Sequence, residues 1–130
     1  MSASERHDRS YLQSRVREEA ARHARHGHPF ALLVFEAVVT GDGVPVHRKL
    51  DWLEEVLRTH VRPSDVIARA FDDTIVALLV ETDAVGARDA LFRLRRIIAE
   101  TGSGASWRPA IYTFPRDGAA ICALPLLTAA

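Results

Sequence analysis

The sequence is poor in cysteine and lysine and contains no long apolar run. Its one cysteine, Cys122, excludes an internal disulfide framework and a cysteine-based zinc site, and it fits a reducing compartment. The apolar runs are too short to span a bilayer, and the polar N-terminus lacks the apolar core of a signal peptide. These absences predict a cytoplasmic chain that does not insert into a membrane.

An excess of charge of one sign is also absent, because Lys+Arg and Asp+Glu each total 17. The chain therefore has no overall field that would attract nucleic acid or an anionic membrane surface, and we expect no nucleic-acid partner. Any ligand must be held by a local cluster of side chains. Among the Lys and Arg residues only Lys49 is lysine, and the planar fork of arginine suits guanine, carboxylate or phosphate.

The composition is that of one ordinary globular domain. The 130 residues are 48% hydrophobic and 26% charged, with 7 Gly and 6 Pro, which supplies enough apolar material for a core. The chain shows no internal repeat, low-complexity segment or linker. It is therefore expected to be a single domain over residues 1–130, with a polar lead at 1–9 and an apolar tail of undefined form at 119–130.

Hydrophobic periodicity predicts the order helix, strand, helix, strand, strand, helix, strand. Helices are expected at residues 10–26 and 47–60 and from Thr82 or Asp83 to a stop at 102–104, and strands at 29–39, 66–70, 74–80 and 107–114. Asp72 and Asp73 lie at the tip of the hairpin that joins 66–70 to 74–80. This order predicts an α/β (α+β) domain in which helices pack on the faces of a mixed sheet.

Residues 61–98 contain, without a gap, an R-x-x-D turn, a strand ending in Ala-Arg, a hairpin, a second strand, a Thr-Asp helix start and an amphipathic helix. This order resembles the centre of GGDEF domains, the family of the diguanylate cyclases. Residues 25–36 are similar to the family's first strand and its lead-in, and residues 110–118 to its Gly-Val-Ala-x-x-Pro-x-x-Gly strand and turn. The resemblance covers residues 10–118 and implies a nucleotidyl-cyclase-like mixed β-sheet of about five strands with helices on both faces.

The signature of that family is replaced. Where GGDEF domains have Gly-Gly-Asp/Glu-Glu-Phe, this chain has Phe71, Asp72, Asp73, Thr74 and Ile75. Two glycines let a nucleotide approach the hairpin backbone closely, whereas Phe71 would obstruct that approach and Asp72 would repel phosphate. The family's substrate segment, with its Asn-Asp pair and its lysine, is shortened to residues 37–46. Because phosphoryl transfer depends on positioning and on neutralisation of charge, we expect no enzyme activity and no cofactor.

A pair of carboxylates remains from the family's metal site. Glu36 stands where the family has an aspartate on its first strand, and Asp73 stands at the acid of the signature. Carboxylate oxygens are ligands for Mg²⁺, but two of them alone are more often solvated or capping groups. We therefore expect no metal site and no catalytic residue. A residual enzyme that uses these two acids and a divalent metal stays an alternative.

The R-x-x-D turn is the strongest candidate site. Arg62 and Asp65 lie five residues ahead of the altered signature, where the resemblance implies the allosteric site for cyclic di-GMP. An arginine fork can donate to O6 and N7 of guanine, and a carboxylate can accept from its N1–H and N2–H groups. By the same resemblance, Arg93 on the following helix would contact the other guanine or a phosphate. The predicted function is a non-catalytic cyclic di-GMP receptor that regulates a protein partner or a homodimer.

Two observations keep another function open. The R-x-x-D pattern alone is weak, because Arg48/Asp51 and Arg69/Asp72 match it as well. The predicted pair can also be interpreted as an exposed turn pair of little energetic weight, with the arginine of the next helix on a solvated face. The alternative function is a protein-interaction scaffold derived from the GGDEF fold that binds no nucleotide.

Overall fold

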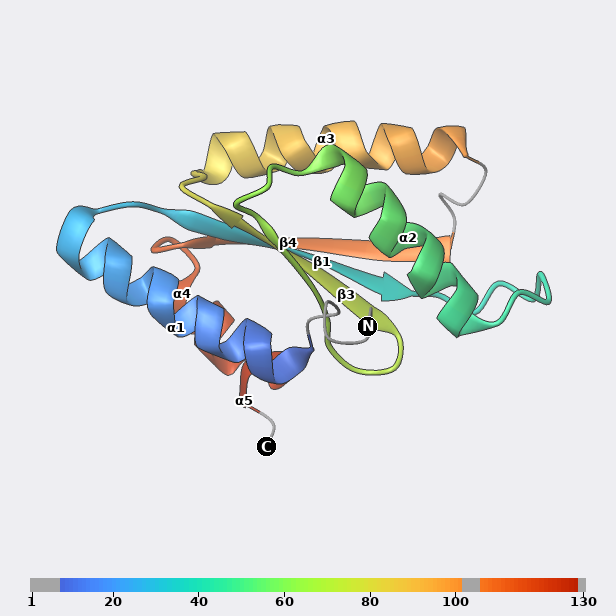
Figure 1. Ribbon diagram of the computed structural model, residues 1–130, viewed down its shortest axis with the longest axis horizontal. Helices are drawn as coiled ribbons and strands as arrows, with labels where there is room; N and C mark the ends of the chain where they lie inside the picture. The colour runs from blue at the N-terminus through green and yellow to red at the C-terminus, as the bar shows by residue number, and fades with distance from the viewer. Residues whose placement is uncertain (1–7, 102–105, 129–130) are drawn as a thin grey trace.

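The computed structural model describes residues 8–101 and 106–128, which form four strands and five helices (Figure 1). In chain order these are α1 (Arg9–His26), β1 (Phe30–Ala37), α2 (Val46–His60), β2 (Val66–Arg69), β3 (Thr74–Val80), α3 (Ala84–Glu100), β4 (Trp107–Phe114), α4 (Gly118–Ala123) and α5 (Pro125–Thr128). Every helix and strand predicted from periodicity is present. The helix stop predicted at 102–104 lies outside the described residues, as do residues 1–7 of the predicted polar lead. Among the described helices, none combines the length and the apolar character needed to span a membrane.

The strands form one sheet in the order β2-β3-β1-β4, and each neighbouring pair is antiparallel. The prediction of a mixed sheet of about five strands is therefore wrong in strand count and in direction. The tight turn at residues 71–73 makes β2 and β3 antiparallel. β1 and β2 run in the same direction, but β3 lies between them, so they form no parallel pair. The described segment after β4 adds no strand, because it folds as α4 and α5.

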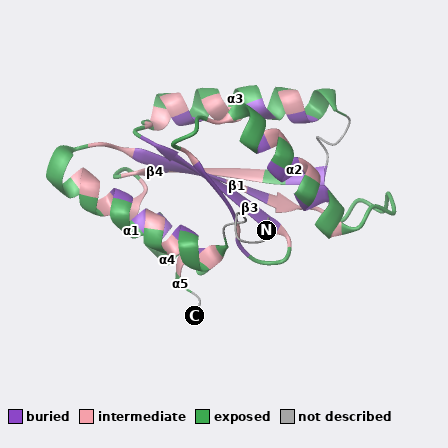
Figure 2. Cartoon of the chain, viewed as in Figure 1, coloured by how far each residue is buried: buried purple, intermediate pink, exposed green. Residues whose placement is uncertain are grey.

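Helices cover the sheet on both faces, as predicted. α2 and α3 pack on one face, whereas α1, α4 and α5 pack on the other (Figure 1). Alternate residues of β1 contribute to the two cores: Leu33 and Phe35 lie on the α2 and α3 side, and Phe30 and Leu32 lie on the α1 side. Since both sides are covered, β3 is buried throughout and β1 is buried at five of its eight residues (Figure 2), which explains their largely apolar sequences.

The apolar tail, whose form the sequence left undefined, contains two short helices. α4 ends at Ala123 and α5 begins at Pro125, so the chain turns at the proline, where a continuous helix would lose a hydrogen bond. Ile121 and Leu126 are buried in the core on the α1 side. The tail therefore completes the core on this face of the sheet.

Local signals place the predicted R-x-x-D turn beside the start of α3. α2 ends at His60, and Pro63 prevents its continuation. The side chain of Asp83 caps α3 by accepting a hydrogen bond from the Gly86 N–H at 2.8 Å. The turn at residues 62–65 then leads directly into β2, whose partner β3 ends next to that cap.

An ion-pair cluster joins α2 to β2. Glu54 accepts hydrogen bonds from Arg58 at 2.7 Å and from Arg69 at 2.8 Å. Burial on its own raises the pKa of the Glu54 carboxyl, but the hydrogen bonds from the two arginines outweigh burial and hold that pKa below its ordinary value. The folded state therefore favours the ionised carboxylate.

We expect this cluster to stabilise the domain at neutral pH and to lose its effect in acid. A carboxyl whose pKa is lowered by folding contributes stability above its unfolded pKa, and the contribution is lost as the pH falls through the folded pKa. The free energy of unfolding of Glu54→Gln, measured by urea denaturation, should be below that of the wild type at about pH 7 and approach it at about pH 3. A difference that does not change with pH would contradict this expectation.

Candidate functional site

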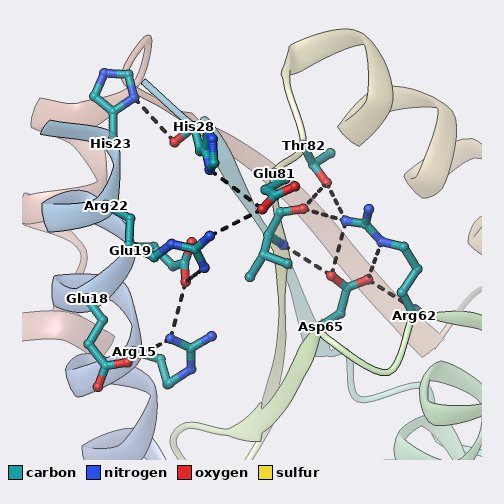
Figure 3. Close-up of polar contacts among 11 residues, drawn as sticks. Arg15, Glu18, Glu19, Arg22, His23, His28, Arg62, Asp65, Glu81 and Thr82 are labelled. Carbon is teal, nitrogen blue, oxygen red and sulfur yellow. Dashed lines mark hydrogen bonds and ion pairs between the residues drawn. The ribbon is translucent and has the colours of Figure 1, made fainter. Parts of the chain in front are cut away.

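The predicted turn is closed by hydrogen bonds around Asp65 (Figure 3). The Asp65 N–H donates to the Arg62 carbonyl at 3.0 Å. The Asp65 carboxylate accepts from the backbone N–H of Arg62 at 3.1 Å and from the backbone N–H of Val80 at 3.1 Å. This side chain is only 3% exposed, so a buried carboxylate links the turn to the end of β3.

The Arg62 guanidinium lies against that carboxylate at the protein surface. Its Nε donates to Asp65 Oδ2 and its Nη2 donates to Asp65 Oδ1, both at 3.3 Å. Nη2 also donates to the Val80 carbonyl and, at 2.9 Å, to Thr82 Oγ1 (Figure 3). Because 54% of the Arg62 side chain is exposed, the ion pair has one buried side and one open side.

All three residues predicted to bind a ligand line one cleft. Arg62 and Asp65 from the turn and Arg93 from α3 border a cleft of about 510 Å³, together with the connection between β3 and α3. Arg93 is exposed and has no ion-pair partner in residues 8–101 and 106–128. The cleft therefore combines one arginine held by a buried acid with a second that is unpaired within the described chain.

Two further acids, Glu81 and Asp83, line the same cleft. The Glu81 carboxylate lies 3.2 Å from Nη2 of Arg22 on α1 and 3.6 Å from Nδ1 of His28 (Figure 3). No sequence signal marks Glu81 as a cleft residue, because its position depends on a left-handed backbone, with φ of 48°, that glutamate rarely adopts. These acids limit where an anionic ligand can lie.

The altered signature closes the hairpin between β2 and β3. The Ala70 N–H donates to the Thr74 carbonyl at 2.9 Å, and residues 71–73 form the turn. Phe71 is exposed at this turn, and the guanidinium carbon of Arg9 lies 5.0 Å from the centroid of its ring. Side chains therefore occupy the hairpin surface at the positions where GGDEF domains have glycine.

The predicted carboxylate pair lies on β1 and at the end of the hairpin turn. Glu36 pairs with Thr74 in the sheet, which places it near Asp73. The Glu36 carboxylate accepts a hydrogen bond from Arg108 at 3.2 Å, and the Asp73 carboxylate accepts one from the Thr74 hydroxyl at 2.9 Å. Within residues 8–101 and 106–128, no group of three or more His, Cys, Asp or Glu side chains is placed to hold a metal ion.

No protein-family model and no curated protein matches the sequence. The structure is similar to that of a DGC protein from Thermotoga maritima, with a TM-score of 0.72 and 17% identity over 86% of this chain and 84% of that chain. It is also similar to PelD from Pseudomonas aeruginosa PA14, both in the apo form, with a TM-score of 0.61 and 21% identity, and in complex with c-di-GMP, with a TM-score of 0.61 and 20% identity.

These similarities show the class of fold, which is that of the GGDEF domains. The comparisons with PelD cover 88% of this chain but only 44% of the PelD chain. This chain therefore spans less than half the length of those PelD structures. The bound c-di-GMP is a property of that PelD structure.

Proposed function

We propose that this chain is a non-catalytic cytoplasmic receptor for cyclic di-GMP, which binds in the cleft lined by Arg62, Asp65 and Arg93. The observation that supports it best is that these three side chains, from two separate segments, border one cleft of about 510 Å³. That volume is within the usual range for small-molecule sites. The shared fold with PelD, which has been solved in complex with c-di-GMP, supports the same ligand.

Guanine recognition in this cleft requires the Arg62–Asp65 pair to open. In the free protein the Asp65 carboxylate accepts two backbone N–H groups and the Arg62 guanidinium. When the guanidinium turns toward a guanine, it can donate to O6 and N7, and it frees carboxylate lone pairs for the N1–H and N2–H groups. The half-exposed position of Arg62 leaves room for this movement.

Arg93, on the α3 side of the cleft, supplies positive charge that can bind the phosphates of the ligand. Glu81 and Asp83 line the cleft and would repel the phosphates of a cyclic dinucleotide. Because Arg93 has no carboxylate partner within the described residues, its guanidinium is available for a phosphate or for the second guanine. Recognition would then combine a guanine site at the turn with a charge-neutralising site on α3.

The shape and charge of the side chains at the altered signature disfavour cyclase activity. Phe71 and Asp72 stand at the two glycine positions of the signature, and Thr74 stands where the family has glutamate. Glu36 is bound to Arg108, so one acid of the remaining pair already has a cationic partner. A nucleotide triphosphate would meet side chains at the hairpin instead of open backbone.

Ligand binding provides a means of regulation. A stacked dimer of cyclic di-GMP presents guanines on opposite sides, so it can bridge this cleft to a second copy of the chain or to another protein. Since the cleft lies at the surface, between the turn and α3, neither arrangement requires the domain to unfold. We propose that the output of the receptor is ligand-dependent association.

A second candidate function is a protein-interaction scaffold that binds no nucleotide. It is favoured by the burial of Asp65, whose carboxylate is only 3% exposed and is fully engaged within the chain. In that case Arg62 and Asp65 would form a structural clamp that holds the turn against the end of β3. The two candidates differ in whether this clamp opens for a ligand.

Isothermal titration calorimetry with cyclic di-GMP separates the two candidates. We expect saturable binding of cyclic di-GMP and no saturable binding of GTP, because the cleft has donors and acceptors for guanine but acids that disfavour a triphosphate. Absence of heat at about 1 mM ligand would refute the receptor and leave the scaffold. Incubation with GTP and Mg²⁺ is expected to yield no cyclic dinucleotide, and any such product would refute the non-catalytic assignment.

A further inference from the structure

A second, larger concavity lies on the opposite side of α3 from the Arg93 cleft. It has a volume of about 830 Å³ and runs between α3 and β4, and we call it the α3–β4 groove. Its lining residues are Phe35, Arg88, Leu91, Phe92, Arg95, Arg96, Ile98, Ala99, Trp107 and Pro109. Phe35, Trp107 and Pro109 come from the sheet, and the other residues come from α3. None of the three proposed ligand residues lines this groove.

The charge of the groove is of one sign. Arg88, Arg95 and Arg96 line it, and no acidic residue does. By contrast, the Arg93 cleft is lined by three carboxylates, those of Asp65, Glu81 and Asp83. Arg96 lies 3.9 Å from the exposed Glu100, whereas Arg88 and Arg95 have no ion pair within residues 8–101 and 106–128. The groove is therefore a basic site in a chain whose total charge is balanced, and it complements a ligand that bears carboxylates or phosphates.

Large apolar groups lie between these arginines. Phe92 is 67% exposed, although a phenyl ring of this size is ordinarily buried. Trp107 is 7% exposed, and its buried indole N–H has no hydrogen-bond partner within the described residues, which is unusual for a buried donor. An occupant that covers Phe92 and offers an acceptor near Trp107 would remove both costs.

The groove also borders an unpaired sheet edge. Within the described residues β4 pairs only with β1, so the backbone groups on its other side bond to no strand. Such an edge can add an extended peptide by backbone hydrogen bonds, while alternate side chains of the peptide enter the adjoining groove. Pro109 has no N–H, so it interrupts this row of donors at one position.

We propose that the α3–β4 groove binds an extended acidic segment of another protein, which adds to the sheet along β4. Its apolar side chains would cover Phe92 and Trp107, and its carboxylates would bind Arg88 and Arg95. A peptide fits better than a nucleic acid, because most lining residues are apolar and the sheet edge offers backbone groups to a polypeptide. This site is independent of the proposed cyclic di-GMP cleft, so either assignment can fail alone.

The test uses a capped eight-residue peptide of alternating valine and glutamate, titrated into the ¹⁵N-labelled chain and followed by NMR. We expect saturable shifts of the β4 amides and of the Trp107 indole, which is assigned with Trp52→Phe. The double variant Arg88→Glu/Arg95→Glu is expected to weaken binding about tenfold or more, because each reversal turns an attraction into a repulsion. The matched control Arg48→Glu/Arg116→Glu, at exposed positions outside the groove, is expected to bind as the wild type does.

Three outcomes would overturn the proposal: no saturable shift with the acidic peptide, equal binding of a valine–lysine peptide, or wild-type affinity in Arg88→Glu/Arg95→Glu. Tighter binding of a twelve-residue oligothymidylate would also overturn it, because it would assign the groove to nucleic acid. If the double variant does not fold, Phe92→Ala replaces it, since this ring is exposed and contributes little to the core. Wild-type affinity of Phe92→Ala would contradict the predicted apolar contact.

Discussion

Arg62→Ala is expected to reduce the affinity for cyclic di-GMP by about 100-fold or more. The substitution removes the guanidinium that would donate to the guanine edge, and it leaves no other arginine at the turn. The backbone N–H groups of residue 62 and of Val80 still bind the Asp65 carboxylate, and the Asp65 N–H still donates to the carbonyl of residue 62, so the turn keeps its three backbone hydrogen bonds. Titration calorimetry measures the loss of affinity, and thermal denaturation shows whether the variant is folded.

Two further variants make this result specific. Arg62→Lys keeps the charge but not the fork, so its affinity should lie between those of the wild type and Arg62→Ala. Arg48→Ala is the matched control, because Arg48 begins another R-x-x-D sequence and is exposed on α2, away from the cleft. If Arg62→Ala binds as tightly as the wild type, the ligand does not use the turn, and the proposed site is refuted.

Much of the fold could be predicted because its signals are local. Gly27 ends α1 in a left-handed conformation with φ of 75°, Pro63 follows the end of α2, and Asp83 caps α3. The number of strands, by contrast, does not depend on local signals alone. Whether residues 119–128 form a strand or helices depends on packing, and the burial of Ile121 and Leu126 on the α1 side favours helices.

The candidate site also has a part that the sequence predicts and a part that it does not. Arg62, Asp65 and Arg93 were predicted from their spacing and from the resemblance to GGDEF domains, and the structure places them on one cleft. Their roles in binding stay predictions. The closed state of the turn could not be predicted, because it depends on the Val80 backbone and the Thr82 hydroxyl, which only the tertiary fold brings to Arg62.

A buried acid on α1 gives the largest stability effect that we predict. Glu19 is fully buried, and its Oε1 has no hydrogen-bond partner within the described residues. Its Oε2 lies 3.2 Å from Arg15 and 3.6 Å from Arg22, and Arg22 also binds Glu81 at the cleft (Figure 3). The pairing of Glu19 with two arginines offsets the cost of removing its carboxylate from water.

Removal of Arg15, the nearer partner, is therefore expected to destabilise the domain. Arg15→Ala leaves the buried carboxylate with only the longer contact to Arg22, and we expect the free energy of unfolding to fall by about 3 kcal/mol. Arg17→Ala is the matched control, because Arg17 is exposed on the same helix and makes no ion pair within the described residues. It should change the free energy of unfolding by less than about 0.5 kcal/mol. Urea denaturation measures both.

A second substitution tests whether the buried charge is the cause. Glu19→Met replaces the carboxylate by an apolar side chain of similar length, so its stability should stay within about 1 kcal/mol of the wild type. In the Glu19→Met background, Arg15→Ala should cost far less than in the wild type, because no buried charge is left unpaired. An equal cost in both backgrounds would mean that Arg15 stabilises α1 by packing alone.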